Sequence, residues 1–377
     1  MQEKDYYLAF SLVSGIGPKT FKLLLKHFKS AEKAWFASPL HLKQAGLSER
    51  LIIKFEKARS ELDIKNYSEK LKQKKASFIA LCDKEYPKLL KEIENPPIGL
   101  FIKALRQAQG KVDLNDYSQA IGIVGTRKIT NYGREVTKLF SSELAQMGFT
   151  IVSGLAMGVD ALSAWSAIEA GGKTIAVMGN GVDLCFPSSN ENLYDKILDG
   201  NGVIISEFPL GFSPNRGSFP ARNRIIAGLS LGVLVTEGAK DSGSLITANY
   251  AFKFKRKVFA VPGPITSSLS VAPLKLIEKG AVLVTSADDI SAILNSQFSI
   301  SNKFSNDKSQ KNNTAQFKNL SKEELKILQI LENEALRFDE IVRKINLDPS
   351  KTGVLLSMME IKGIIKPLGD GSFGRTA

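Results

Sequence analysis

The sequence predicts an α/β protein: an extended Rossmann-like core with a doubly wound, mostly parallel sheet, preceded by a helical domain and followed by a winged helix. Three observations support this. Residues 76–295 alternate apolar strand-like runs with helical patterns, residues 1–75 show only helical spacing, and residues 320–377 contain three helical patterns and a short hairpin. A length of 377 residues also favours several domains.

The N-terminal domain, residues 1–75, is expected to be helical because its apolar residues recur at helical spacing, as in Leu23, Leu24, Phe28, Trp35 and Phe36. Residues 14–19 (SGIGPK) carry the Gly-x-Gly turn of a helix-hairpin-helix, whose backbone amides can face a phosphate. A tight helix–helix turn without a ligand explains the same residues equally well.

The core, residues 76–295, contains apolar runs of strand length separated by helical patterns. The expected strands are 120–124, 150–153, 174–178, 203–206, 233–236, 258–261 and 281–284. Helices are expected over 132–147, 159–170 and 244–255, among others. Alternation of this kind predicts parallel strands with helices on both faces of the sheet.

Two polar stretches interrupt the pattern. Residues 104–118 are expected to form an exposed loop, and residues 296–319, rich in Ser, Asn, Lys and Gln, a flexible linker. Beyond the linker, Ser321 and Glu324 have the spacing of a capping box. Helical patterns at 338–345 and 349–362, followed by a glycine-containing hairpin, predict a winged helix for residues 320–377.

The net charge of +13 favours a polyanionic partner or a membrane surface. The core holds 22 Lys and Arg against 20 Asp and Glu, so it must concentrate its cations locally to bind an anion. No apolar run approaches the ~20 residues of a membrane span, and the N-terminus lacks a signal pattern. Cys82 and Cys185 are far apart in the sequence. The protein is therefore expected to be cytoplasmic.

The sequence does not match the common patterns of catalytic or cofactor-binding sites. The histidines, His27 and His41, both lie in the N-terminal domain, which excludes a histidine-based acid/base or zinc site in the core. Residues 172–174 (GKT) resemble the end of a P-loop but close a helix rather than follow a strand. The turns at 122–127 and 179–181 lack the third glycine of a dinucleotide fingerprint. No cofactor and no metal are expected.

Glycine-containing turns follow the strands, and the carboxyl ends of parallel strands share one edge of the sheet. These turns are 125–127, 153–156, 179–181 and 242–244, with the segment 216–224 before a further helix. Turn amides and helix N-termini favour phosphates. Phe219 offers a face to a base, and four arginines offer bidentate phosphate contacts: Arg127, Arg216, Arg222 and Arg224. The sequence therefore predicts an anion site at this edge.

An alternative is that these turns are ordinary loops, with Arg222 or Arg224 paired to Glu207 or Glu237.

These segments resemble those of the DNA-processing protein A (DprA/Smf) family along residues 5–375. The matching motifs are 123–127 (IVGTR), 153–160 (SGLAMGVD), 172–181 (GKTIAVMGNG), 219–230 (FPARNRIIAGLS), 242–248 (SGSLITA) and 261–263 (VPG). The resemblance implies a non-enzymatic binder of single-stranded DNA that dimerises and loads the RecA recombinase during natural transformation. It also implies that the N-terminal domain is SAM-like.

The resemblance places the DNA pocket at Thr126, Arg127, Arg216, Gly217, Phe219, Arg222, Asn223 and Arg224, with Lys173 and Ser244 at its edge. Two positions depart from the family pattern. Ala164 stands where a histidine is common, and Ala272-Pro273-Leu274 replaces a Gly-Thr-Asn-like triplet.

Two other functions compete with this prediction. A nucleotide hydrolase related to the Lonely Guy phosphoribohydrolases would share the core, but residues 242–247 (SGSLIT) do not provide that family's Gly-Gly-x-Gly-Thr loop and glutamate. A winged-helix regulator would read duplex DNA while the core senses a nucleotide, yet the second and third helices of the winged helix offer only Arg343, Lys344, Lys351 and Lys362 as cations.

Overall fold

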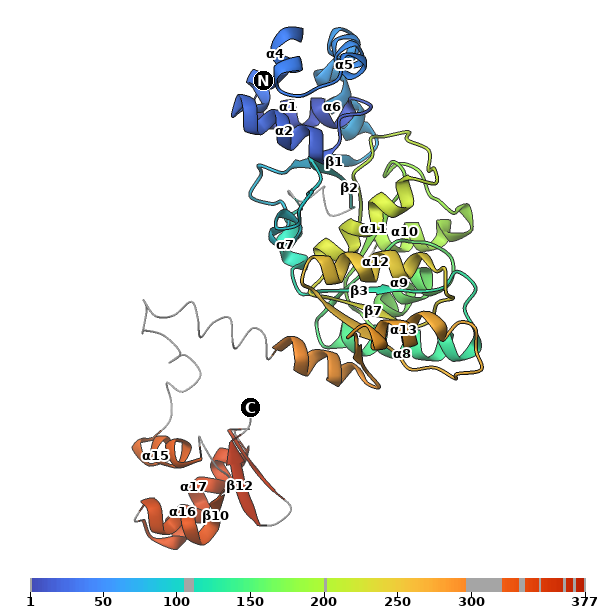
Figure 1. The fold of residues 1–377 in the computed structure, drawn as a ribbon. Helices are drawn as coiled ribbons and strands as arrows, with labels where there is room; N and C mark the ends of the chain where they lie inside the picture. Colours follow the sequence, from blue (N-terminus) through green and yellow to red (C-terminus); the bar gives the residue numbers. More distant parts are fainter. Residues whose placement is uncertain are drawn as a thin grey trace. The chain divides into compact units, whose positions relative to one another are not determined.

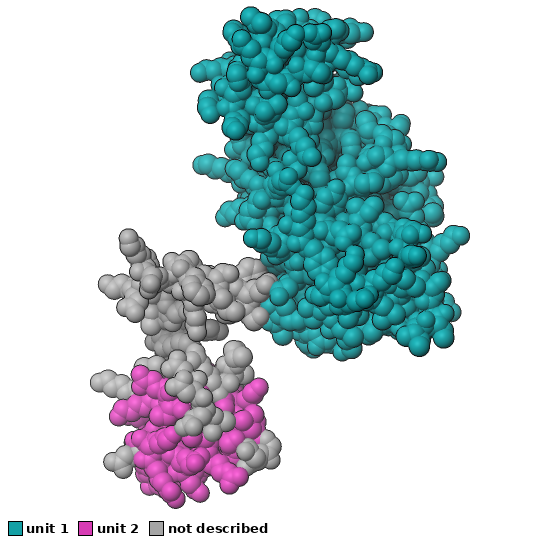
Figure 2. All heavy atoms as spheres, in the orientation of Figure 1, with its two compact units in different colours: residues 1–299 teal, residues 300–377 magenta. Residues whose placement is uncertain are grey.

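The computed structural model describes residues 2–104, 112–199, 202–295, 321–331, 336–345, 347–361, 364–368 and 371–375. The chain divides into two compact units, Met1–Ser299 and Ile300–Ala377 (Figure 2). The predicted linker at 296–319 lies outside the described residues, as do Lys362 and residues 105–111 of the predicted loop at 104–118.

Six helices build the N-terminal part of the first unit: α1 (Glu3–Leu12), α2 (Pro18–Phe28), α3 (Ala31–Trp35), α4 (Pro39–Gln44), α5 (Glu49–Glu61) and α6 (Ile64–Gln73). Side-chain oxygens of Ser30, Ser38 and Asp63 accept hydrogen bonds from backbone amides at the starts of α3, α4 and α6. The hairpin at 14–19 joins α1 to α2 and borders a cavity of about 750 Å³ against the core. Its role toward a phosphate stays a prediction.

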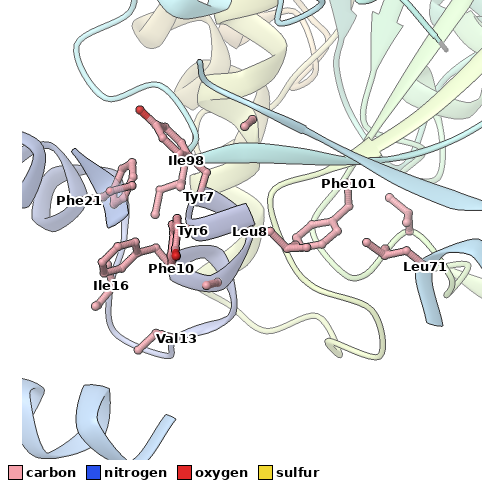
Figure 3. Close-up of a cluster of buried hydrophobic side chains, with 14 of the residues drawn as sticks. Tyr6, Tyr7, Leu8, Phe10, Val13, Ile16, Phe21, Leu71, Ile98 and Phe101 are labelled. Carbon is pink, nitrogen blue, oxygen red and sulfur yellow. The ribbon is translucent and has the colours of Figure 1, made fainter. Parts of the chain in front are cut away.

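The helices share a hydrophobic core with the edge of the sheet. Phe10 packs between the rings of Phe21, Trp35 and Phe55. The same buried cluster includes Leu71 of α6 and Phe101 of the sheet (Figure 3). Residues 1–75 therefore do not separate from the core as a compact unit of their own.

The core sheet has nine strands in the order β1-β2-β6-β5-β4-β3-β7-β8-β9. Figure 1 shows β1 and β2 next to the N-terminal helices, and β3 and β7 among the helices of the core. The strands are β1 (Ala76–Ala80), β2 (Gly99–Lys103), β3 (Ala120–Val124), β4 (Thr150–Ser153), β5 (Thr174–Met178), β6 (Gly202–Ser206), β7 (Gly232–Val235), β8 (Lys257–Ala260) and β9 (Val282–Leu283). β3 to β9 pair in parallel, whereas β2 pairs antiparallel with β1 and β6. The predicted fold class is confirmed, and β1 and β2 are strands that the prediction omitted.

Helices cover both faces of this sheet. They are α7 (Lys88–Lys91), α8 (Asn131–Gln146), α9 (Val159–Glu169), α10 (Glu191–Asp199), α11 (Ser218–Leu229), α12 (Gly243–Lys253), α13 (Val271–Glu278) and the helical residues 287–295, with 3₁₀ turns at Leu114–Tyr117 and Ser188–Asn190. Phe140 of α8 packs with Ile121 and Ile123, and Ile225 of α11 packs with Val124 and Val233. Alternate residues of β3 thus point to opposite helical layers, as expected for a doubly wound sheet.

The second unit contains α15 (Lys322–Ile330), β10 (Leu336–Arg337), α16 (Phe338–Ile345), α17 (Pro349–Ile361), β11 (Ile365–Pro367) and β12 (Ser372–Arg375). The three strands form a small antiparallel sheet in the order β10-β12-β11. Ser321 and Glu324 form the predicted capping box at the start of α15. Ile327, Ile341 and Leu356 belong to the buried core of this winged helix.

Candidate nucleic-acid interface

A cavity of about 610 Å³ opens where the loops after β3 and β7 meet the start of α11. The chain builds β4 to β6 on one side of β3 and then crosses to β7 on the other. Such a switch in strand order leaves a crevice at the carboxyl ends of the strands, where ligands bind in open α/β sheets. Seven of the ten predicted site residues line this cavity: Thr126, Arg127, Arg216, Phe219, Arg222, Asn223 and Ser244.

Arg127 and the ring of Phe219 lie together at the cavity, and a second aromatic ring lies beside Phe219. The guanidinium carbon of Arg127 lies 5.5 Å from the ring centroid of Phe219. The ring of Phe186 lies 6.0 Å from Phe219, tilted by 35°, and Phe186 is 46% exposed. A side chain at Gly179 would come within 3.1 Å of the Phe219 ring, so the glycine lets the ring lie against the turn after β5. Phe186 was not among the predicted site residues.

Arg216 lies at the tip of the loop that enters α11. The side-chain oxygen of Asn215 accepts hydrogen bonds from the amides of Gly217 and Ser218, at 2.9 and 3.0 Å, and so fixes the turn. Gly217 is the N-cap residue of α11 and does not itself line the cavity. Arg216 and Arg127 are both exposed. Across the part of the chain that the structure describes, neither arginine takes part in an ion pair.

Arg222 is a buried structural residue, only 4% exposed. Its Nη1 donates to the carbonyl of Val177 at 2.8 Å, and a Cβ at Gly154 would lie 1.3 Å from that nitrogen. Asp160 lies nearby and accepts from the amide of Gly154 at 3.1 Å. Burial raises the pKa of Asp160, and the positive charge of Arg222 opposes that rise. Arg222 therefore joins α11 to β5 by a hydrogen bond and packs against the turn after β4.

Arg224 does not lie at the cavity. Its guanidinium binds both carboxylate oxygens of Glu207 and donates to the carbonyl of Asn95 at 2.9 Å. The structure therefore does not bring all four predicted arginines to this cavity, and for Arg224 it shows the alternative, a pair with Glu207. Arg224 follows Arg222 by two residues on α11, and its side chain reaches Glu207, directly after β6, instead of the cavity.

Lys173 is also placed elsewhere. It directly precedes β5, at the end of the strand opposite to the cavity. Its ammonium lies 3.4 Å from the carbonyl oxygen of Asp116 and 5.4 Å from the ring centroid of Tyr117. The structure therefore does not bring Lys173 together with the other predicted residues.

Most turn amides are already used within the fold. The backbone amide of Thr126 donates to the backbone carbonyl of Glu237, and the amide of Gly181 donates to the backbone carbonyl of Phe212. At the start of α12, Ser242 accepts from the amide of Ser244 at 3.3 Å, while Gly243 is exposed at the cavity. The anion-binding groups are thus fewer than predicted: two arginines and one helix N-terminus.

Two general features accompany this site. Within the described ranges no group of three or more His, Cys, Asp or Glu side chains is arranged to hold a metal ion. The helices of the described residues include none that is long and apolar enough to span a membrane.

Comparison with known proteins identifies the family. The family model of DNA recombination-mediator protein A matches residues 77–295, more than half of the chain. The chain belongs to this family. A second model, the DprA winged helix domain, matches residues 313–371.

Relatives and solved structures agree with this assignment. The chain is 42% identical over 296 residues to protein Smf of Synechocystis, covering 78% of this chain and 73% of the relative. It is 42% identical over 212 residues to the DNA processing protein DprA of Bacillus subtilis, covering 56% and 69%. The structure of DprA from Streptococcus pneumoniae matches with a TM-score of 0.67 and 32% identity, over 76% of this chain and 97% of that one.

A structure of DprA from Helicobacter pylori, described as giving insight into its single-stranded DNA binding mode, matches with a TM-score of 0.51 and 29% identity. It covers 60% of this chain and 96% of its own. The predicted family resemblance is confirmed, and relatives of the DNA recombination-mediator protein A family favour DNA processing over nucleotide hydrolysis.

Proposed function

We propose that this protein binds single-stranded DNA in the cavity between the β3 and β7 loops and acts as a recombination mediator. The observation that carries the proposal is that two exposed arginines, Arg127 and Arg216, line a cavity with the half-buried ring of Phe219 at the switch point of the sheet. The single-stranded DNA binding mode described for the Helicobacter pylori relative supports the choice of ligand.

Each part of the site matches one part of a single strand. Arg127 and Arg216 bind phosphate oxygens by paired N–H donors, and the N-terminus of α12 adds a partial positive charge. Bases lie against Phe219 and Phe186, which any base can do because every base has an apolar face. In a duplex the bases are already stacked on one another, so single strands gain more from these rings.

The proposed mechanism makes and breaks no bond. Of the carboxyl groups at the cavity, Asp160 is buried and occupied by the amide of Gly154, while Asp241 is exposed at the rim. Asp160 is accounted for as a support of Arg222. The protein then serves to hold DNA for another protein rather than to alter it.

The family supports the wider proposal. As a cytoplasmic homodimer, the protein would lay out incoming single-stranded DNA and load RecA on it during natural transformation. The family model describes a recombination mediator, which fits a protein that passes DNA to a recombinase. The winged helix, with few cations on its helices, would serve protein contacts or weak duplex binding.

A mobility-shift assay with single-stranded and duplex oligonucleotides tests this proposal. We expect the single strand to bind more tightly, with a logarithmic salt slope of about −0.7 for each phosphate neutralised. A chain lacking residues 320–377 should keep this preference, because the cavity lies in the first unit. Tighter duplex binding, loss of single-strand binding on deletion, or release of free base from nucleoside monophosphates would each contradict it.

A further inference from the structure

A second cavity adjoins the first. It has a volume of about 380 Å³ and is formed by the turn after β3, the start of α8 and one face of α9. Arg127 lines both cavities and so forms the boundary between them. A linear polymer that is bound in the first cavity and extends past Arg127 would therefore enter the second cavity.

Three cations converge on this second cavity without a carboxylate among its lining residues. They are Arg127, Lys128 and Arg134, and all three are exposed. Within the ranges that the structure describes, none of them takes part in an ion pair. Arg134 lies in the second turn of α8, near the positive end of the helix dipole, where a cation gains nothing from the helix. Mutual repulsion of these charges is relieved when an anion binds between them.

The floor of the second cavity is apolar and contains an indole. Ala161, Leu162 and Trp165 follow one another at helical spacing along α9. Trp165 is half-buried and packs against the core cluster that contains Ala164 and Leu155, which holds the ring in place. An anchored ring bordered by cations has the composition of a stacking platform for a nucleotide.

We propose that the second cavity is a second subsite for the same single strand, which crosses Arg127 from one cavity to the other. Lys128 and Arg134 bind the phosphates beyond Arg127, and a base lies on Trp165. The inference rests on the proposed function, because it extends the strand bound in the first cavity. It predicts that strands long enough to reach the second cavity bind more tightly than strands that fill the first cavity alone.

Fluorescence polarisation with oligothymidylates of about 4 to about 16 nucleotides, the usual range of site sizes, tests the inference on the full chain. For Lys128→Ala with Arg134→Ala we expect unchanged affinity for the shortest strand, about tenfold weaker binding of long strands, and a salt slope smaller by about 1.4. Trp165→Leu keeps the apolar contact with the core. It should weaken the binding of long strands, and of these alone, by at least about fivefold.

Lys138→Ala with Lys196→Ala is the matched control, since both lysines are exposed on helices and line neither cavity. It should bind all lengths like the native protein. The inference is overturned if the Lys128/Arg134 variant binds long strands normally, or loses affinity equally at every length. If the native protein binds oligothymidylates of every length no more tightly than the Arg216→Ala variant does, the proposed function itself is wrong.

Discussion

Replacing Arg127 and Arg216 together by alanine is expected to weaken single-stranded DNA binding by at least about 100-fold. A hydrogen bond to a charged group contributes about 1.5–3 kcal/mol, so two arginine–phosphate contacts contribute about 3 kcal/mol or more, and each 1.4 kcal/mol is about tenfold in affinity. Both side chains are exposed and without ion pairs among the described residues, so the free energy of unfolding should hardly change. Fluorescence polarisation at fixed salt and denaturant unfolding measure the two quantities.

Lysine variants separate charge from geometry at these two positions. Arg127→Lys with Arg216→Lys keeps both charges but loses the paired donors, so its affinity should fall between those of the native protein and the alanine variant. A loss of less than about threefold in the alanine variant would show that the strand binds elsewhere.

Arg224→Met is expected to lower the free energy of unfolding by about 3–5 kcal/mol, the usual effect of removing one partner from a buried ion pair. The side chains of Arg224 and Glu207 are only 11% and 15% exposed. Without the arginine, Glu207 would remain as a buried carboxyl group. The folded variant should still bind single-stranded DNA like the native protein, because Arg224 does not line the DNA cavity. Denaturant unfolding and polarisation on the same preparation measure both effects.

The stability that Arg224→Met loses should depend on pH. Burial raises the pKa of Glu207, and Arg224 opposes that rise in the native protein. In Arg224→Met the folded-state pKa rises further above the unfolded value. The loss of stability relative to the native protein is therefore small at pH values where Glu207 is protonated in both folded proteins. It grows as the pH rises through the folded-state pKa of the native protein toward the higher folded-state pKa of the variant.

Adding Glu207→Gln to Arg224→Met should recover much of the lost stability at neutral pH, since no charge then stays buried. If Arg224→Met instead keeps native stability but no longer binds DNA, Arg224 belongs to the DNA-binding site.

The sheet could be read from the sequence because its strands are apolar runs that end at glycine-containing turns. The bounds of β3, β4 and β5 coincide with the predicted ones. The antiparallel strands β1 and β2 were omitted because they lie outside the strand–helix alternation and extend the sheet from its β6 side. Arg127, Arg216 and Phe219 were placed correctly at the cavity because turns after parallel strands share one edge.

The remaining errors have two different causes. Strand direction already places Lys173 at the far end of β5, so the sequence contained that correction. The pairing of Arg224 with Glu207 instead depends on a tertiary contact. Phe186 and Trp165 are different, because nothing in their local sequence shows that a distant turn brings them beside Arg127 or Phe219. The use of turn amides by Glu237 and Phe212 likewise depends on tertiary contacts.

Photo-crosslinking of the intact protein to a single strand containing bromodeoxyuridine, followed by mass spectrometry of the peptides, measures directly where the DNA lies. We expect crosslinks in the peptides that carry Phe186 and Phe219, on the rim formed by the carboxyl ends of the strands. Crosslinks found only in the N-terminal helices or only in the winged helix would contradict the assignment of this rim as the DNA-binding surface.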